Sequence, residues 1–179
     1  MTSEGWAGRI AIPLMKWFSL PTTRWLVFLI GAALIVVGGY QTLQLFWENP
    51  AYPLHTDIHL YMRAGDYIVR GVNPYSAAAN PGFDIYGYPP LLADVMGLLN
   101  LAIGATATTI CWTLFCVASL IGAIVLMCRS FGFKLGWPWI LLIIGIVSLG
   151  RVTRIDIYHG QVNVIILCAL LAGLVWHSQ

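Results

Sequence analysis

The sequence predicts an all-α, polytopic membrane protein, and two observations support this fold class. First, 59% of the residues are hydrophobic, only 9% are charged and the mean hydropathy is +0.81, whereas roughly a quarter of the residues of a soluble domain are charged. Second, the charged residues are concentrated near the chain ends and in polar segments, so that long apolar runs contain no Asp, Glu, Lys or Arg. Such runs are typical of membrane-spanning helices.

We expect the whole chain, residues 1–179, to form a single membrane domain with four spans. A bilayer core is crossed by about 20 apolar residues, and Trp25 and Trp47 bracket the first candidate as interfacial anchors. The segment 90–103 is apolar, but it is short and contains Asp94, so it is predicted to be an interfacial or re-entrant helix, although a crossing stays open. The predicted spans are 25–46, 108–128, 137–149 and 162–176.

The distribution of basic residues predicts the orientation, because Lys and Arg mark cytoplasmic ends. Three basic residues precede the first span, which reads as a retained signal anchor. If 90–103 does not cross, Arg129 and Lys134 are also cytoplasmic. The loop 48–107 and the polar segment 150–163 are then both extracytoplasmic. Polar groups from two parts of the chain are therefore expected to converge outside the membrane, which we take to be a bacterial plasma membrane.

The composition does not support nucleic-acid binding, and the cysteines do not indicate disulfides or a zinc site. The net charge is +2 and no cluster of Lys and Arg alternates with aromatic residues, so a nucleic-acid partner is not expected. The four cysteines lie in apolar segments without the spacing of a disulfide framework or a zinc site. We interpret them as small packing residues.

The loop between the first two spans is predicted to contain a helix that begins near Asp57. Thr56 is a plausible N-cap, and Gly71 can end the helix in the left-handed conformation. Asp57 and Tyr61 are four residues apart and therefore share one face. The helix is amphipathic, so we expect it to lie along the membrane surface. Its apolar face comprises Ile58, Tyr61, Ala64 and Ile68.

Two proline-containing turns follow in the same loop. Asn73-Pro74-Tyr75 turns the chain after the predicted helix, and Tyr86-Gly-Tyr88-Pro89-Pro90 forms a rigid aromatic corner, because two prolines restrict the backbone. Connections between elements are usually much shorter than this loop. The loop is therefore expected to build a site rather than merely to join two spans.

At these residues the chain resembles the polyprenyl-phosphate-mannose-dependent mannosyltransferases of glycosyltransferase family 87, within the GT-C class of multi-span enzymes. The resemblance rests on the order and spacing of motifs and covers about residues 25–177. Members of this family are usually much longer, so the chain resembles the N-terminal part of one. The motifs are Asp57 with Tyr61, Gly71-Val-Asn73-Pro74-Tyr75, Tyr88-Pro89-Pro90 and His159-Gly160-Gln161-Val-Asn163.

The resemblance implies that Asp57 is the catalytic base. A carboxylate within hydrogen-bond reach can take the proton of an acceptor hydroxyl as it attacks the anomeric carbon. Direct displacement inverts that centre and needs no second carboxylate as nucleophile. The competing interpretation is that Asp57 is only a favourable acid in the first turn of a helix. Asp66 is the second candidate for the base, although it can instead pair with Arg63 or Arg70.

Eight further residues are candidates for substrate binding. Arg151 and Arg154 can hold the lipid phosphate or only extend to lipid headgroups. His159, Gln161 and Asn163 open the last span, where a helix N-terminus favours anions, but the last two can instead bond to neighbouring helices. The remaining three are tyrosines that can stack on a sugar or pack: Tyr61, Tyr75 and Tyr88.

No cofactor and no metal is expected. The alternative is a metal site in which His55 and His59, on either side of Asp57, are ligands. Only two carboxylates lie nearby to complete such a site.

The sequence therefore predicts transfer of a hexosyl, specifically mannosyl, residue from a polyprenyl-phosphate sugar to a lipid or glycan acceptor on the extracytoplasmic face, among membrane lipids. The alternative is a non-catalytic polytopic protein, either transporter-like or a truncated remnant or subunit. A transporter would place ionisable groups and broken helices near the bilayer midplane. Here the apolar runs are uninterrupted and the polar groups gather at one surface, which favours the enzyme.

Overall fold

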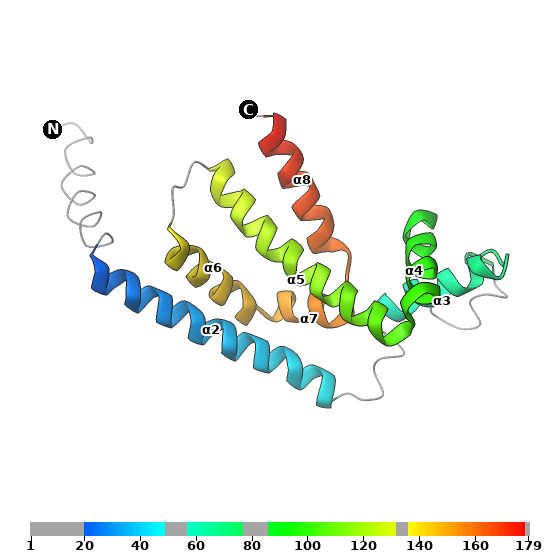
Figure 1. Ribbon diagram of the computed structural model, residues 1–179, viewed down its shortest axis with the longest axis horizontal. Helices are drawn as coiled ribbons and strands as arrows, with labels where there is room; N and C mark the ends of the chain where they lie inside the picture. Colours follow the sequence, from blue (N-terminus) through cyan, green and yellow to red (C-terminus); the bar gives the residue numbers. More distant parts are fainter. Residues whose placement is uncertain (1–19, 49–56, 77–85, 132–135, 178–179) are drawn as a thin grey trace.

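The computed structural model describes residues 20–48, 57–76, 86–131 and 136–177. Within these ranges the chain forms seven helices and no strand (Figure 1), which confirms the predicted all-α class. The predicted N-cap Thr56 and the candidate ligand His55 lie outside the described residues. The helices are α2 (Pro21–Glu48), α3 (Asp57–Val69), α4 (Pro90–Ile103), α5 (Ala105–Ser130), α6 (Trp137–Leu149), α7 (Arg151–His159) and α8 (Asn163–His177).

Two helices are long and apolar enough to cross a membrane, and they contain the first two predicted spans. Helix α2 has 28 residues, which corresponds to about 42 Å at 1.5 Å per residue. Helix α5 has 26 residues and no acid in its first turn. Both lengths exceed a hydrocarbon core of about 30 Å, so the protein is an integral membrane protein by these two helices alone.

The other two predicted spans form shorter helices. Helix α6 has 13 residues and α8 has 15, both below the roughly 20 residues of a typical span. Helices α7 and α8 together are apolar enough to count as one broken span or re-entrant loop, bent by 105°. The structure thus provides two or three spans by length, and the count of four stays a prediction.

The long helices pair in two layers that run in opposite directions. Helix α2 packs mainly on α6, and α5 packs mainly on α8. In Figure 1, α2 and α6 run from the side of the N-terminus toward α7, whereas α5 and α8 run back from that region. Consequently the end of α2, the start of α5, the end of α6 and the start of α8 lie toward one end of the bundle. This arrangement agrees with alternating crossings.

Small residues allow α2 and α6 to approach closely. A Cβ added at Gly31 would lie 2.8 Å from the backbone nitrogen of Leu142, and one at Gly145 would lie 2.8 Å from the Gly31 carbonyl oxygen. Ser148 donates a hydrogen bond to the Gly145 carbonyl, at 2.7 Å, within α6. Close backbone packing of this kind drives helix association where no water is present to strengthen apolar contacts.

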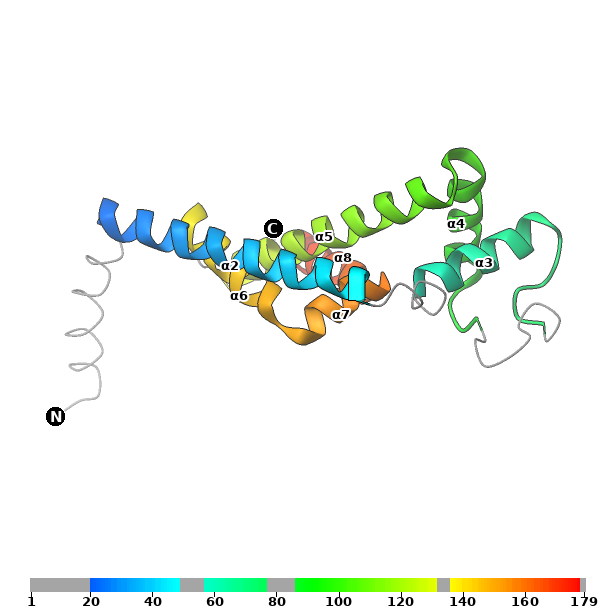
Figure 2. The same ribbon diagram turned by 90° about the horizontal axis from the view of Figure 1, so that it is seen from below.

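Helices α3 and α4 form a separate, closely packed pair beside the start of α5, shown from below in Figure 2. A Cβ added at Gly97 would lie 2.8 Å from the Gly65 carbonyl oxygen, so the two backbones touch. The side-chain amide of Asn100 donates a hydrogen bond to Asp66 at 2.9 Å. Helix α4 leaves Leu91, Leu98 and Leu101 exposed on its other face, as expected for an interfacial helix.

The predicted loop geometry is largely confirmed. Helix α3 begins at Asp57, and its buried residues include Ile58, Tyr61 and Ala64 of the predicted apolar face. Gly71 has a φ of +72° and follows the helix in the left-handed region, where a residue without a Cβ is favoured. The main buried core of the molecule gathers around this helix, and it also includes side chains of α4, α5 and the first turn of α8.

Candidate active site

Asp57 is the first residue of α3 and is half-buried. The Tyr88 hydroxyl donates a hydrogen bond to Asp57 Oδ2 at 3.3 Å, across 31 positions of sequence. This distance is longer than the roughly 2.7–2.8 Å of a short O–H···O bond, so the contact orients the carboxylate without saturating it. The structure records no ion pair between Asp57 and any described cation. Its oxygens therefore retain capacity to accept a proton.

Aromatic rings form the wall beside this carboxylate. Tyr61 is fully buried, its ring lies edge-on to Tyr88 with centroids 4.7 Å apart, and the centroid of the Trp112 ring lies 5.9 Å away. Burial is the main cause that raises the pKa of Tyr61, followed by its contact with Tyr88. Its hydroxyl is buried without a well-formed hydrogen bond to any described residue. Tyr61 thus packs beneath the site rather than lining an open surface.

The aromatic corner positions Tyr88 through hydrogen bonds to its backbone. The Tyr75 hydroxyl donates to the Tyr88 carbonyl at 2.6 Å, and the Tyr86 hydroxyl donates to the Pro89 carbonyl at 2.9 Å. Asn73 forms the preceding turn by accepting the Tyr75 backbone N–H on its side-chain oxygen at 3.0 Å. Burial raises the pKa of Tyr86 to about 12, which keeps its hydroxyl a donor at neutral pH. The turn at Asn73-Pro74-Tyr75 and the corner at 86–90, which were predicted separately, are therefore hydrogen-bonded to each other and together position Tyr88.

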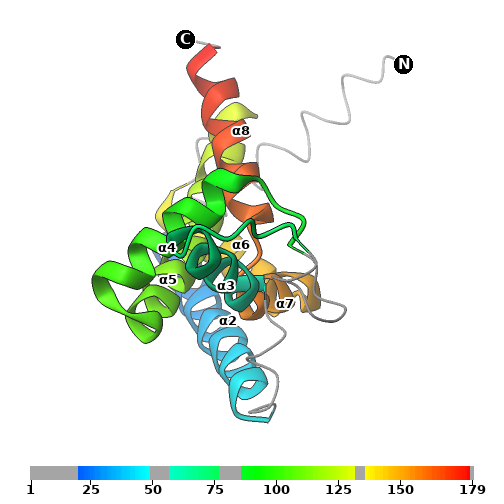
Figure 3. The same cartoon turned by 90° about the vertical axis from the view of Figure 1, so that its right-hand side faces the viewer.

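The turn between α7 and α8 contacts α3 and α5 through Gly160, and Figure 3 views the molecule from the end at which α3 lies. Gly160 has a φ of +68°, and a Cβ there would lie 3.1 Å from Ile58 Cβ. The indole N–H of Trp112 donates to the Gly160 carbonyl at 2.7 Å. The predicted meeting of the loop and the later polar segment is thus a direct contact, made next to Asp57. Only glycine fits this turn without strain, because of both its φ and its crowding.

Asp156 is a second carboxylate near the site. It is half-buried on α7, and burial raises its pKa, with Asn163 and His159 opposing that shift and the charge of Asp57 adding to it. Sequence reasoning placed this residue in the polar segment but gave it no role. In the sequence, Asp156 is one acid in a short polar run between apolar segments, and this pattern by itself does not indicate a functional site.

The three polar candidates His159, Gln161 and Asn163 lie in and beside the turn between α7 and α8. The Asn163 side-chain amide donates to Gln161 Oε1 at 2.7 Å, and the Gln161 backbone N–H donates to the Asp156 carbonyl at 2.9 Å. The Gln161 carbonyl accepts a weak hydrogen bond from the Cys116 thiol at 3.8 Å. His159 stacks edge-on to Tyr158, with centroids 5.3 Å apart. Apart from the Cys116 contact, which joins the turn to α5, these contacts are local, and the Asn163 side chain is exposed.

The two candidate phosphate ligands lie earlier on α7. Arg151 is its first residue and is exposed, whereas Arg154 is half-buried. Arg154 Nε is buried without a hydrogen bond to a described residue. The structure records no hydrogen bond or ion pair from either arginine to Asp57 or to Tyr88 within the described ranges. Arg154 therefore lies on the same short helix as Asp156, but neither arginine contacts Asp57, the predicted base.

The remaining candidates are separated from Asp57. Asp66 lies at the opposite end of α3, where its partner is Asn100, so it braces the α3–α4 pair. His59 lies on α3, and burial lowers its pKa. Among the residues that the structure describes, no group of three His, Cys, Asp or Glu side chains is arranged to hold a metal ion.

Trp112 is the residue at this site that sequence reasoning missed entirely. It lies in a predicted membrane span, where an aromatic residue is unremarkable, and yet its ring contacts Tyr61 and its N–H binds the Gly160 carbonyl. No local signal reveals this role, because it depends on the neighbour that α5 meets in space.

The fold and this cluster define an all-helical membrane protein with a half-buried carboxylate at a bundle end, supported by tyrosines and approached by a second polar turn. The family model of glycosyltransferase family 87 matches residues 86–179, just over half of the chain, and no curated protein and no solved structure matches it. The chain belongs to glycosyltransferase family 87 and is a membrane glycosyltransferase. Tyr88 and the α7–α8 turn lie within the matched residues, whereas Asp57 precedes them.

Proposed function

We propose that this protein transfers a hexosyl, specifically mannosyl, residue from a polyprenyl-phosphate sugar to a lipid or glycan acceptor on the extracytoplasmic face, with inversion. Asp57 is the catalytic base. The single observation that carries this proposal is the Asp57 carboxylate itself: it is half-buried at the start of α3, held by the Tyr88 hydroxyl at 3.3 Å and free of any ion pair to a described cation.

The reaction needs one proton acceptor and a bound leaving group. The acceptor hydroxyl donates its proton to Asp57 as its oxygen attacks the anomeric carbon, and the bond from that carbon to the phosphate oxygen breaks. The polyprenyl phosphate leaves with the electron pair. Arg154 and Arg151 on α7 supply cationic donors for this phosphate. The surrounding tyrosines, above all the exposed ring of Tyr75, offer faces on which a sugar can stack.

The position of the cluster supports a lipid-linked donor. Helices α3 and α4 are amphipathic or apolar and lie beside the ends of the long helices, where a membrane surface would be. A polyprenyl chain can then stay in the bilayer while its phosphate and sugar reach the carboxylate.

The test compares Asp57→Asn with Asp66→Asn, the same change at the two ends of one helix. Membranes that contain the full chain are incubated with radiolabelled polyprenyl-phosphate mannose and an acceptor extract. We expect Asp57→Asn to lower transfer by about 100-fold or more, since it removes the base, and Asp66→Asn to retain transfer. Both variants should insert into the membrane in equal amounts.

Retained transfer in Asp57→Asn would remove this residue from the mechanism. Loss of transfer in both variants at equal expression would point instead to a structural effect on α3.

A further inference from the structure

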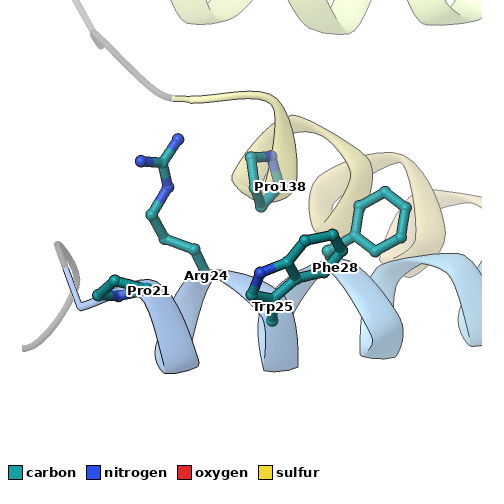
Figure 4. A pocket seen from close by; sticks show the side chains of 5 residues that line it. All are labelled: Pro21, Arg24, Trp25, Phe28 and Pro138. Carbon is teal, nitrogen blue, oxygen red and sulfur yellow. The ribbon is translucent and has the colours of Figure 1, made fainter.

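The end of the bundle remote from Asp57 contains a cavity that the glycosyl-transfer mechanism does not use. It has a volume of about 350 Å³ and lies where α2 and α6 begin. Figure 4 shows the Arg24 side chain on one side of this cavity and the rings of Trp25 and Phe28 on the other, with Pro138 of α6 above them. Its lining residues are Pro21, Arg24, Trp25, Phe28 and Pro138.

Apart from Arg24, this lining is apolar. The rings of Trp25 and Phe28 meet edge-on, with centroids 5.8 Å apart. Trp25 lies near the start of a helix that is long and apolar enough to span a bilayer, and tryptophan at such a position anchors at the membrane interface. The cavity is therefore expected to open at the level where lipid headgroups meet acyl chains.

Arg24 has no acidic partner among the described residues at this end. Its guanidinium extends toward the start of α6, where a Cβ added at Gly136 would lie 3.7 Å from Arg24 Nη2. Glu48, at the other end of α2, is 24 positions away, which corresponds to about 36 Å along the helix. The acids of the described part of the chain lie in α3, α4 and α7 or end α2: Glu48, Asp57, Asp66, Asp94 and Asp156.

We propose that this cavity, bounded by Arg24, Trp25, Phe28 and Pro138, binds an anionic phospholipid of the surrounding membrane. Its phosphate accepts hydrogen bonds from the Arg24 guanidinium, a donor whose planar fork suits phosphate oxygens. One acyl chain lies against the rings of Trp25 and Phe28. A zwitterionic lipid fits less well, because its ammonium group meets no carboxylate from the described residues here.

The test uses the purified full chain in nanodiscs that contain a phosphatidylglycerol or a phosphatidylcholine carrying the same photoactivatable acyl chain. Crosslinked peptides are mapped by mass spectrometry. We expect labelling around Trp25, Phe28 and Pro138 to be about fivefold stronger with phosphatidylglycerol, as one cationic contact with an anionic headgroup implies. Arg24→Gln should abolish this preference and Arg24→Lys should largely preserve it.

Arg129 provides the matched control, because it is exposed in the last turn of α5 and does not line the cavity. Arg129→Gln should leave the preference unchanged. Equal labelling by both lipids in the unaltered protein would overturn the proposal, and this comparison does not depend on the folding of any variant. The proposal is equally overturned if labelling appears only after removal of residues 1–19, because the chain itself would then fill the cavity.

Discussion

The geometry around Asp57 depends on single hydroxyl groups. Tyr88 donates to the carboxylate, and Tyr75 in turn donates to the backbone of Tyr88. Burial is the main cause that raises the pKa of Tyr88, and the charge of Asp57 adds to it. The Tyr88 hydroxyl therefore stays protonated across the physiological range and acts as a donor. The proposed role of Tyr88 is to orient the carboxylate. Asp57 is the group that accepts the proton of the acceptor hydroxyl.

Tyr88→Phe removes this donor while keeping the ring that packs on Tyr61. A hydrogen bond to a charged group contributes about 1.5–3 kcal/mol, and the long 3.3 Å contact places this one at the low end. We expect the rate of sugar transfer to fall about tenfold, with little change in the KM for the donor. Initial rates in membranes at several donor concentrations measure both quantities.

Tyr75→Phe is the comparison, because the Tyr75 hydroxyl donates to the Tyr88 backbone carbonyl and not to the Asp57 carboxylate. Its rate should fall less than that of Tyr88→Phe. An unchanged rate in Tyr88→Phe would exclude the aiming role.

At the scale of the elements, the site depends on how closely α3 and α4 approach each other. The backbones touch at Gly65 and Gly97, and Asp66 and Asn100 bond one turn further along. Because α4 begins at Pro90, directly after Tyr88 and Pro89, its position on α3 determines where the Tyr88 ring lies. Packing at one end of the pair thereby supports the carboxylate at the other.

Gly97→Ala should destabilise this pair. The added methyl group would lie 2.8 Å from the Gly65 carbonyl oxygen, and overpacking of this kind typically costs about 1–3 kcal/mol. We expect the thermal midpoint of the purified protein in detergent to fall by several degrees and sugar transfer to fall with it.

Gly173→Ala in α8 is the matched change, because a Cβ there meets nothing within 4 Å. It should leave the midpoint unchanged or raise it slightly, since alanine favours the helix by about 1 kcal/mol over glycine. Equal midpoints for the two variants would show that the α3–α4 contact is looser than described.

At the scale of the whole molecule, the proposed chemistry requires the loop that contains α3 and the α7–α8 turn to lie on one side of the membrane. The opposite directions of α2 and α5 place both at the same end of the bundle. Basic residues near the other end, including Arg24 and Arg129, favour the cytoplasm for that end.

Cysteine labelling of intact cells tests this orientation. In a variant whose four native cysteines are replaced by alanine, Val72→Cys in the loop after α3 should react with a membrane-impermeant maleimide. Ser130→Cys at the end of α5 should react only after permeabilisation. Both positions are exposed, so a difference reports the side of the membrane. Labelling of Val72→Cys only after permeabilisation would place the site in the cytosol and contradict the proposal.

The sequence by itself determined the features that depend on local composition. Apolar runs predict helices α2 and α5 because the bilayer requires long apolar helices, and the amphipathic pattern after Asp57 predicts α3. The left-handed φ of Gly71 follows from the same local reasoning. The apolar runs 137–149 and 162–176 coincide with helices α6 and α8 to within one residue. Whether these short helices are complete spans stays a prediction, because hydropathy does not reveal the 105° bend between α7 and α8.

Only the tertiary structure decided which of the candidate residues meet. The contact of Tyr88 with Asp57 and that of Trp112 with Gly160 join residues that are 31 and 48 positions apart. Such contacts depend on the angles and distances at which helices pack, which small residues such as Gly97 determine in space. Periodicity along one helix carries no information about its neighbour, and so Asp66 stayed a second candidate for the base in sequence, although the fold gives it a different partner from Asp57.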